Sequence, residues 1–387
     1  MMQVLWRIPI TSEGIPIYGF GMMLFLAFIL CTWLAGRFAE SEGISKETVQ
    51  DLAIWVFIGG LLGARTTYLL NEDPRPGLVE FFRKLPMIWE GGIVLYGSII
   101  GGTVSFFLAY FLIYRKRGLS VPRFLDAIAP AIALGIGLGR IGCLLNGCCF
   151  GQVACADGPV YFPAKFPLSA PCRETLVDSG AQTVAGFTLA EDRVQTGQGA
   201  RIAAVLPGSP AYQAGLRPNA RIQTVNGFPI YSSAEMHRYL GSMAAWPRGE
   251  TTLTLTYQPQ GEEQTVTSTI SPRSLGLYPT QLYETISMGL LMLLLIAYWG
   301  YRKNPGQVIA VMMAAYGVHR FLNEMLRDDP RPKGFESYGS IFLMVTGLML
   351  WIYYQLQSRS PGAANETGSG KPFSGKSGTS PGLSPSS

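Results

Sequence analysis

Seven long stretches of the chain carry very few charges, and this feature restricts the fold more than any other. They lie at about 17–36, 50–70, 93–114, 123–145, 281–301, 306–326 and 338–356. A helix of about 20 apolar residues is long enough to cross the hydrocarbon core of a bilayer. Charged residues make up 14% of the 387 residues, whereas soluble domains average about 25%. The sequence therefore predicts an all-α polytopic membrane bundle of seven transmembrane helices.

Basic residues beside these stretches predict how the bundle is oriented. Arg115-Lys116-Arg117 and Arg302-Lys303 stand in the two shortest connections. Both clusters fall on the side of the C-terminus when the N-terminus is outside, and an excess of Lys and Arg favours the cytoplasmic side. We therefore expect the N-terminus out and the C-terminus in. Residues 357–387 are rich in Gly, Ser, Pro and Lys, which is typical of a disordered cytoplasmic tail.

Residues 152–277 differ from the rest of the chain because they contain no apolar stretch. Ser209 and Pro210 suit the start of a short helix, and Asn226-Gly227 suits a tight hairpin. A second short helix is expected at about 234–243. These signals predict a small α+β domain between the fourth and fifth membrane helices. Alternation typical of strands occurs at 200–206, 221–225 and 251–257.

The insert contains G-S-P-A-Y-Q-A-G-L at 208–216 and I-Q-T-V-N-G at 222–227. These segments resemble bacterial PDZ domains, and the resemblance covers roughly 185–272. It implies a domain in which residues 186–189 receive a peptide carboxylate. The expected orientation places this domain in the periplasm, so a periplasmic peptide or protein is an expected ligand. The alternative is a spacer with a degenerate groove. The expected organisation is membrane helices one to four in 1–151, a Cys-containing periplasmic loop in 152–184, the PDZ-like domain in 185–272, helices five to seven in 273–356 and the tail in 357–387.

Ionisable side chains occur inside several predicted membrane helices, where each is costly and marks a candidate functional site. They are Arg65, Asp126, Arg140 and the group Tyr316, Arg320, Glu324 and Arg327. The four-residue spacing places Tyr316, Arg320 and Glu324 on one helix face, where Arg320 and Glu324 can pair. Three or four embedded cations with fewer acids indicate an anionic ligand, and phospholipid phosphate is the anion found at that depth. A structural ion pair between helices is the alternative.

Several spaced motifs occur along the chain: G-R-I-G-C-L-L-N-G-C-C-F-G at 139–151, Y-P-T-Q-L-Y-E at 278–284, Tyr316-Gly317 with Arg320, Glu324 and Arg327, and the segments 17–19, 63–65 and 91–97. Together they resemble the motifs of the prolipoprotein diacylglyceryl transferase family. The resemblance covers roughly 15–150 and 275–356, in the family's order. It implies an enzyme of the bacterial cytoplasmic (inner) membrane that moves the diacylglyceryl group of phosphatidylglycerol onto the lipobox cysteine of a prolipoprotein signal peptide. A thioether forms and glycerol 1-phosphate is released; membrane lipids surround the enzyme and no cofactor is implied.

The resemblance also implies roles for individual residues. Arg140 and Arg320 are expected to hold the phosphate and to stabilise its charge as it leaves, with Glu324 orienting Arg320. Tyr96 stands where many members have a histidine that is a proposed thiol-activating base, so Tyr96 is the expected base and proton uptake by the leaving phosphate is the alternative. The residues expected to bind phosphatidylglycerol are Tyr18, Arg65, Arg140, Asn146, Gly151, Tyr316 and Arg320.

The six cysteines predict no metal site, because they lack the paired C-x-x-C spacing of zinc ligands. The motif H-E-x-x-H is absent as well, which argues against an intramembrane zinc protease. Four cysteines fall on the expected outer side, where disulfides persist. Cys148 and Cys149 are expected to bridge to Cys155 and Cys172, and a nucleophilic cysteine is the alternative.

Other functional classes fit less well. No basic stripe with interleaved aromatic residues occurs, so nucleic acid is not an expected partner. Many family members have Asn and Glu where this chain has Cys143 and Cys148, and these departures, with Tyr96, favour a rival hypothesis. In it the chain is a non-catalytic membrane receptor that binds phospholipid and also binds peptides through the PDZ-like domain. The arginines argue against a pure scaffold, and a transporter ranks last because repeats of broken helices are not detectable.

Overall fold

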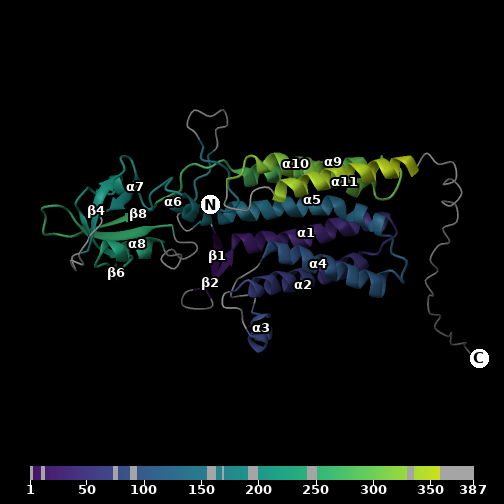
Figure 1. Ribbon diagram of the computed structural model, residues 1–387, viewed down its shortest axis with the longest axis horizontal. Helices are drawn as coiled ribbons and strands as arrows, with labels where there is room; N and C mark the ends of the chain where they lie inside the picture. Colours follow the sequence, from purple (N-terminus) through teal and green to yellow (C-terminus); the bar gives the residue numbers. More distant parts are fainter. Residues whose placement is uncertain are drawn as a thin grey trace, which may run out of the picture.

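The computed structural model describes residues 3–9, 14–72, 77–87, 94–154, 163–167, 170–190, 199–241, 251–328 and 335–357. Figure 1 shows a bundle of long helices with a small sheet domain at one end; we call this the domain end and the opposite one the far end. The described helices are α1 (Gly19–Ser41), α2 (Lys46–Leu70), α3 (Leu78–Lys84), α4 (Leu95–Ala109) with a π-helical turn (Tyr110–Tyr114), α5 (Val121–Asn146), α6 (Pro171–Asp178), α7 (Pro210–Gln213), α8 (Ser233–Gly241), α9 (Thr280–Trp299), α10 (Gln307–Glu324) and α11 (Phe335–Gln357). The strands are β1 (Val4–Ile8), β2 (Ile15–Tyr18), β3 (Phe187–Leu189), β4 (Ala200–Val205), β5 (Arg221–Val225), β6 (Phe228–Pro229), β7 (Leu253–Gln258) and β8 (Val266–Ile270).

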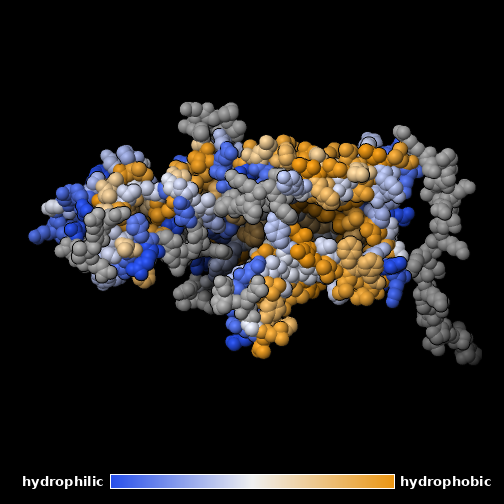
Figure 2. Space-filling model, viewed as in Figure 1, coloured by the Kyte–Doolittle hydropathy of each residue, from blue (hydrophilic) through white to orange (hydrophobic). Residues whose placement is uncertain are grey.

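Six of the described helices are long and apolar enough to cross a membrane: α1, α2, α4 with its π-helical turn, α5, α9 and α11. At most 33% of the apolar window of each is buried inside the protein, so most of these side chains face outward. Figure 2 shows the resulting hydrophobic surface along the bundle, as contact with lipid requires. The prediction of seven spans is therefore confirmed for six. The remaining predicted stretch is found as α10, whose apolar character is reduced by His319, Arg320, Asn323 and Glu324.

Glycines allow α2 and α4 to pack with their backbones in contact. A Cβ atom added to Gly63 would stand 2.3 Å from the carbonyl oxygen of Gly97, and one added to Gly101 would stand 2.2 Å from that of Gly59. The spacing of four residues places both glycines of each helix on one face. This is the small-residue packing by which membrane helices associate without a hydrophobic driving force.

Replacing Gly101 by Ala will lower the stability of the protein by about 1–3 kcal/mol, because the added methyl group overpacks this contact. The measurement is thermal unfolding of the purified protein in detergent. Gly289→Ala on α9 is the matched control, since nothing lies within 4 Å of a Cβ there and alanine is favoured over glycine in a helix by about 0.5–1 kcal/mol. Equal midpoints for Gly101→Ala and the wild type would contradict the packing described here.

Asp126, near the start of α5, is fully buried and joins helix ends at the far end of the bundle. Its carboxylate accepts hydrogen bonds from the backbone N–H groups of Gly306 (2.7 Å) and Ile309 (2.9 Å) and so caps α10. Arg302 lies 3.2 Å from the same carboxylate and also pairs with Glu42, just after α1. Asp126 is therefore held in a structural network that connects α1, α5 and α10.

The insert forms an antiparallel sheet with strand order β3-β4-β5-β7-β8, and β6 pairs with β5. The strands predicted at 200–206, 221–225 and 251–257 are found as β4, β5 and β7. At the start of α7 the Ser209 hydroxyl accepts a hydrogen bond from the backbone of Tyr212 at 3.2 Å. Asn226 and Gly227 have φ angles of 49° and 82°, as the predicted tight hairpin requires. Buried side chains from β4, β5, β7 and α8 form a core within the insert.

Short elements cover the domain end of the bundle between the membrane helices and the insert. Phe166 is fully buried in a cluster with Phe150 and Leu277, which contains residues before and after the insert. From the N-terminal segment, the side-chain amide of Gln3, just before β1, donates to the backbone carbonyl of Asn146, the last residue of α5, at 3.0 Å. The end of α5 is thus enclosed by segments far apart in the sequence.

Candidate active site

Three helices bring charged and polar side chains together near the domain end. Arg140 of α5 pairs with Glu284 of α9, with Nε and Oε2 2.9 Å apart. The Asn323 side-chain amide of α10 donates to the same oxygen at 2.7 Å. The side chain of Glu284 is 1% exposed and that of Arg140 is 17% exposed, so the pair lies inside the protein. Because the ion pair uses Nε, it does not consume the terminal nitrogens of Arg140, which match two phosphate oxygens.

Arg320 and Glu324 form the pair predicted from their spacing on α10. Arg320 Nη2 stands 3.6 Å from Glu324 Oε2, and the two side chains are 13% and 18% exposed. Asn323, next to Glu324, is the residue that bonds Glu284. The two ion pairs thus lie on three helices, α5, α9 and α10, with the Asn323–Glu284 hydrogen bond between α10 and α9. We call Arg140, Glu284, Arg320, Asn323 and Glu324 the charged group. Tyr316 is partly buried on the same helix and packs its ring against His319, with centroids 6.4 Å apart.

The five residues that follow α5, which we call the cysteine loop (147–151), are held by the start of α9. Gln281 donates its side-chain amide to the carbonyl of Cys148 at 2.6 Å, and Thr280 donates its hydroxyl to that of Cys149 at 2.9 Å. The loop begins with Gly147 at φ 76°, in the left-handed region that ends many helices. Cys149 has φ 59°, which is uncommon for a residue other than glycine.

Gly151 closes the cysteine loop, and its surroundings explain why a glycine stands there. Its backbone N–H donates to the carbonyl of Tyr278 at 3.0 Å, and it forms a β-bridge with Arg327. A Cβ atom would stand 2.8 Å from both Thr280 and the Tyr278 carbonyl. The close contacts of Gly151 are with Tyr278, Thr280 and Arg327, and its contact with phosphatidylglycerol stays a prediction.

The other predicted site residues fall into two places. Tyr18 ends β2 beside α1 and is 41% exposed; its neighbour Gly19 bonds Gln3, which in turn bonds Asn146. Arg65 on α2 is buried, donates from Nε to the carbonyl of Lys84 at 3.2 Å and stands 5.4 Å from the Tyr68 ring. Tyr96 is 52% exposed on the first turn of α4. Arg65 and Tyr96 thus lie on α2 and α4, which pack together, whereas Arg140 lies on α5 and Arg320 on α10.

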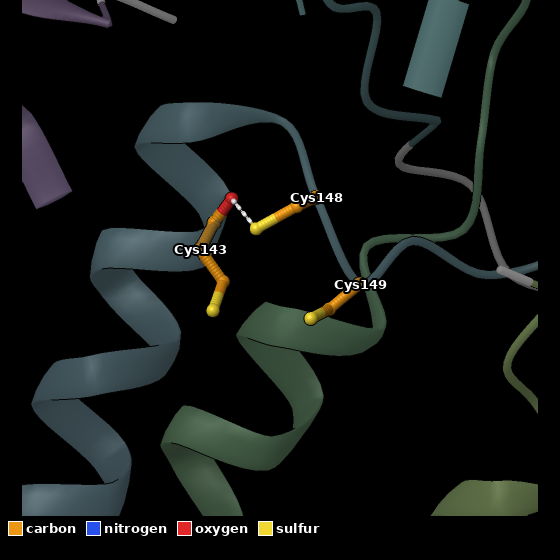
Figure 3. A group of neighbouring side chains, drawn as sticks. All are labelled: Cys143, Cys148 and Cys149. Carbon is orange, nitrogen blue, oxygen red and sulfur yellow. Dashed lines mark hydrogen bonds between the residues drawn. The ribbon is translucent and has the colours of Figure 1, made fainter. Parts of the chain in front are cut away.

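Three cysteines gather where α5 ends. The Sγ atoms of Cys143, Cys148 and Cys149 all lie within 4.8 Å of one another. Figure 3 shows the three thiols pointing into one space between the end of α5 and the first turn of α9. The sequence predicted no such group because the spacing does not match C-x-x-C. That prediction is wrong for these three cysteines. The left-handed turn at Gly147 reverses the chain and brings Cys148 and Cys149 back beside Cys143.

The predicted disulfides are absent among the described cysteines. Cys148, Cys149 and Cys172 are thiols, and Cys155 lies outside the described residues. Cys172 in α6 is fully buried, and burial raises the pKa of its thiol to about 12. It is therefore protonated and unreactive at neutral pH. In the described part of the chain, hydrogen bonds from α9 hold the cysteine loop where disulfides were expected.

Sequence reasoning gave no role to Glu284, the acidic partner of Arg140, although the motif at 278–284 ends on it. The signal was present, because Glu284 is an ionisable side chain in a predicted membrane helix. The candidate site residues were instead taken from the arginines and from the group Tyr316, Arg320, Glu324 and Arg327. Asn323 was missed because a neutral amide gives no such signal. His319 was also left without a role; its Nε2 is buried and has no hydrogen-bond partner among the described residues.

Comparisons with known proteins show the family to which the chain belongs. The profile of the prolipoprotein diacylglyceryl transferase family matches residues 7–353. A phosphatidylglycerol–prolipoprotein diacylglyceryl transferase of Rhodopirellula baltica is 37% identical over 53% of this chain and 41% of its own length. The enzyme of that name from Clostridium tetani is 24% identical over 89% of this chain and 96% of its own length.

For the insert, the HtrA3 PDZ domain bound to a phage-derived ligand covers 30% of this chain and 86% of that domain at 19% identity. The TM-score of 0.17 is too low to establish the fold of the insert. The family match covers residues 7–353, so it runs from the N-terminal hairpin into α11 and includes every helix that carries the charged group. The chain therefore belongs to the prolipoprotein diacylglyceryl transferase family.

Proposed function

We propose that the charged group on α5, α9 and α10 is where this chain transfers the diacylglyceryl group of phosphatidylglycerol to the lipobox cysteine of a prolipoprotein. The observation that carries the proposal is the presence of two mostly buried arginines, each paired with a glutamate: Arg140 with Glu284, and Arg320 with Glu324. The helices that carry the two pairs are joined by the hydrogen bond from Asn323 to Glu284. Guanidinium groups bind phosphate through two parallel hydrogen bonds and keep their charge. Two buried arginines held in fixed positions are better explained by binding of a lipid phosphate than by a purely structural ion pair between helices.

The reaction places a growing negative charge on the phosphate. The substrate thiolate attacks the diacylglyceryl carbon that carries the phosphate oxygen, the C–S bond forms, and the electrons of the C–O bond leave with glycerol 1-phosphate. Cations fixed in a water-poor site stabilise such a developing charge strongly. Glu284 and Glu324 hold the guanidinium groups of Arg140 and Arg320 in place. The proton that the thiol loses is taken up by the released phosphate, whose second pKa is about 6, or passes to water.

An apolar cavity on the other side of α5 supports the choice of a lipid substrate. It has a volume of about 380 Å³ and lies between α1, α2, α4 and α5, with Phe28, Val56 and Phe106 among its lining residues. Gly135 is one of its lining residues and precedes Arg140 by five residues, which corresponds to about 7.5 Å along the helix. We propose that an acyl chain occupies this cavity and that the lipid passes around α5, so that its phosphate lies near Arg140.

We further infer that α10 is the seventh span and that the N-terminus lies outside. The polar side chains of α10 contact α9 and one another, and ionisable groups are tolerated in membranes when they face the interior of a bundle. The basic segment Arg115–Arg117 and Arg302 lie at the far end, opposite the insert. The positive-inside rule then puts the far end in the cytoplasm and the insert in the periplasm.

The test of the proposed function is a transfer assay with purified protein in lipid vesicles. Phosphatidylglycerol labelled in its diacylglyceryl part is mixed with a lipobox peptide, and label on the peptide is measured after separation. We expect label on the peptide cysteine and none on a peptide in which that cysteine is replaced by serine. Folded protein that binds phosphatidylglycerol but transfers no label would support the receptor hypothesis instead.

We also propose that the insert binds a segment of the preprotein near the site. β3 lies at the edge of the sheet, and an exposed edge strand can accept an extended peptide. Excision of 185–272 is expected to lower lipidation of a full-length preprotein about tenfold, as the loss of roughly 1.4 kcal/mol of binding would. Transfer to a short lipobox peptide is the control and should persist. Equal lipidation of every preprotein by both proteins would rule the role out.

A further inference from the structure

The cluster of Cys143, Cys148 and Cys149 has the dimensions of a metal site. Zinc bound tetrahedrally by cysteine has Zn–S distances of about 2.3 Å, which places sulfur atoms about 3.8 Å apart. The three Sγ atoms lie within 4.8 Å of one another without any ion, so a shift of about 1 Å completes the geometry. Each side chain offers one sulfur, and Figure 3 shows all three directed into the same space.

The cluster is held in this arrangement before any ligand binds. Cys143 is on the last turn of α5, and the backbone of the cysteine loop is fixed by Thr280 and Gln281. Cys149 takes the left-handed φ of 59°, a conformation that costs of order 1–3 kcal/mol and persists where the surroundings enforce it. The hydrogen bonds from α9 enforce it here, and they aim the Cys149 thiol at Cys143.

We propose that Cys143, Cys148 and Cys149 bind one zinc ion and that its fourth position takes the thiol of the substrate cysteine. This inference rests on the proposed function. Three protein ligands and one open position are the arrangement of catalytic zinc sites. A thiol that coordinates the metal loses its proton, and the thiolate is the nucleophilic form of cysteine. The zinc site would therefore activate the substrate thiol, a role that the sequence analysis assigned to Tyr96.

The step balances without any change of oxidation state. The substrate thiol binds zinc and gives up its proton, which leaves with the phosphate product or to water. The bound sulfur then attacks the diacylglyceryl carbon, the C–S bond forms and the C–O bond to phosphate breaks. The thioether that results is a weaker ligand than a thiolate, so zinc is left with the three cysteines.

The position of the cluster beside the arginines favours this assignment. Arg140 lies one helical turn before Cys143, and Arg327 forms a β-bridge with Gly151, two residues after Cys149. Three thiolates around a divalent ion leave a single negative charge, and a fourth thiolate adds another. Nearby guanidinium groups offset that charge, which is costly to bury alone. The activated sulfur would also stand next to the residues that hold the phosphate.

The first experiment measures metal content. The full-length protein is purified without chelator, reduced, and analysed for zinc by mass spectrometry. We expect about one zinc per chain in the wild type and a loss of about 100-fold in affinity in Cys143→Ser and Cys149→Ser, which remove a ligand. Cys31→Ser is the matched control, because its thiol donates to the carbonyl of Ala131 in another part of the bundle. Reduced, folded wild type that takes up no zinc would overturn the inference, as would a disulfide within the cluster in protein isolated from cells.

The second experiment asks whether the fourth position takes the substrate. Co²⁺ replaces zinc in the wild-type protein, and its thiolate-to-metal absorption is recorded before and after addition of a lipobox peptide. We expect the band to grow and shift with the cysteine peptide and to stay unchanged with the S-methylated peptide. Identical spectra with both peptides would overturn substrate coordination.

The outcomes separate this inference from the proposed function. Transfer activity that persists in metal-free wild type would overturn the zinc site while the proposed function stands. Zinc binding with the expected spectral response, but without transfer of diacylglyceryl, would overturn the proposed function and leave the thiol-binding metal site in place.

Discussion

Arg140→Gln will lower the rate of diacylglyceryl transfer by about 10²–10³-fold, which is the loss seen when one preorganised donor to a developing charge is removed. Arg320→Gln is expected to fall in the same range. The variant that carries both changes should transfer no measurable label, because the leaving phosphate then has neither buried cation. The measurement is the initial rate of label transfer to a lipobox peptide at several phosphatidylglycerol concentrations.

Arg140→Lys separates charge from geometry. Lysine keeps the positive charge but cannot offer two parallel N–H groups to phosphate, so we expect a rate between those of the wild type and Arg140→Gln. Arg115→Gln at the far end is the matched control, since Arg115 lies over the Phe111 ring and not in the charged group. If both glutamine variants are folded and transfer at the wild-type rate, these arginines are structural and the proposed site is wrong.

Much of the bundle follows from the sequence because the lipid bilayer imposes simple rules. The apolar stretches at 17–36, 50–70 and 123–145 are found as α1, α2 and α5, since a chain that crosses lipid must satisfy its backbone within helices. The pairing of Arg320 with Glu324 was also predictable, because residues four apart on a helix face the same way. Each of these predictions uses only the residues of a single helix and requires no knowledge of how the helices pack.

Contacts between distant segments could not be predicted in the same way. The pairing of Arg140 with Glu284 depends on how α5 packs against α9, and Asp126 becomes a cap for α10 only when the far end assembles. The cysteine cluster depends on two residues with left-handed φ angles, Gly147 and Cys149. A reversal of the chain at that point defeats any inference from the spacing of cysteines along the sequence.

Glu284→Gln will both destabilise the protein and slow transfer. The change keeps the size of the side chain and its contact with Asn323 but removes the charge that balances Arg140. Breaking a buried ion pair by removing one partner costs about 3–5 kcal/mol. Glu80→Gln is the matched control. Glu80 pairs with Lys84, but the Glu80 side chain is 56% exposed, and exposed ion pairs contribute only about 0–1 kcal/mol to stability.

The kinetic effect distinguishes positioning from simple stability. Without Glu284, Arg140 keeps its charge and still attracts the lipid phosphate, so we expect KM for phosphatidylglycerol to change little. The guanidinium is no longer fixed, and misplacement by about 1 Å can cost about 10²-fold in rate, so kcat should fall by that order. Asn323→Ala removes one hydrogen bond to Glu284 and should lower kcat less. A variant with a lowered unfolding temperature but wild-type kcat at a temperature where it is folded would show that Glu284 joins α5 to α9 without positioning Arg140 for the reaction.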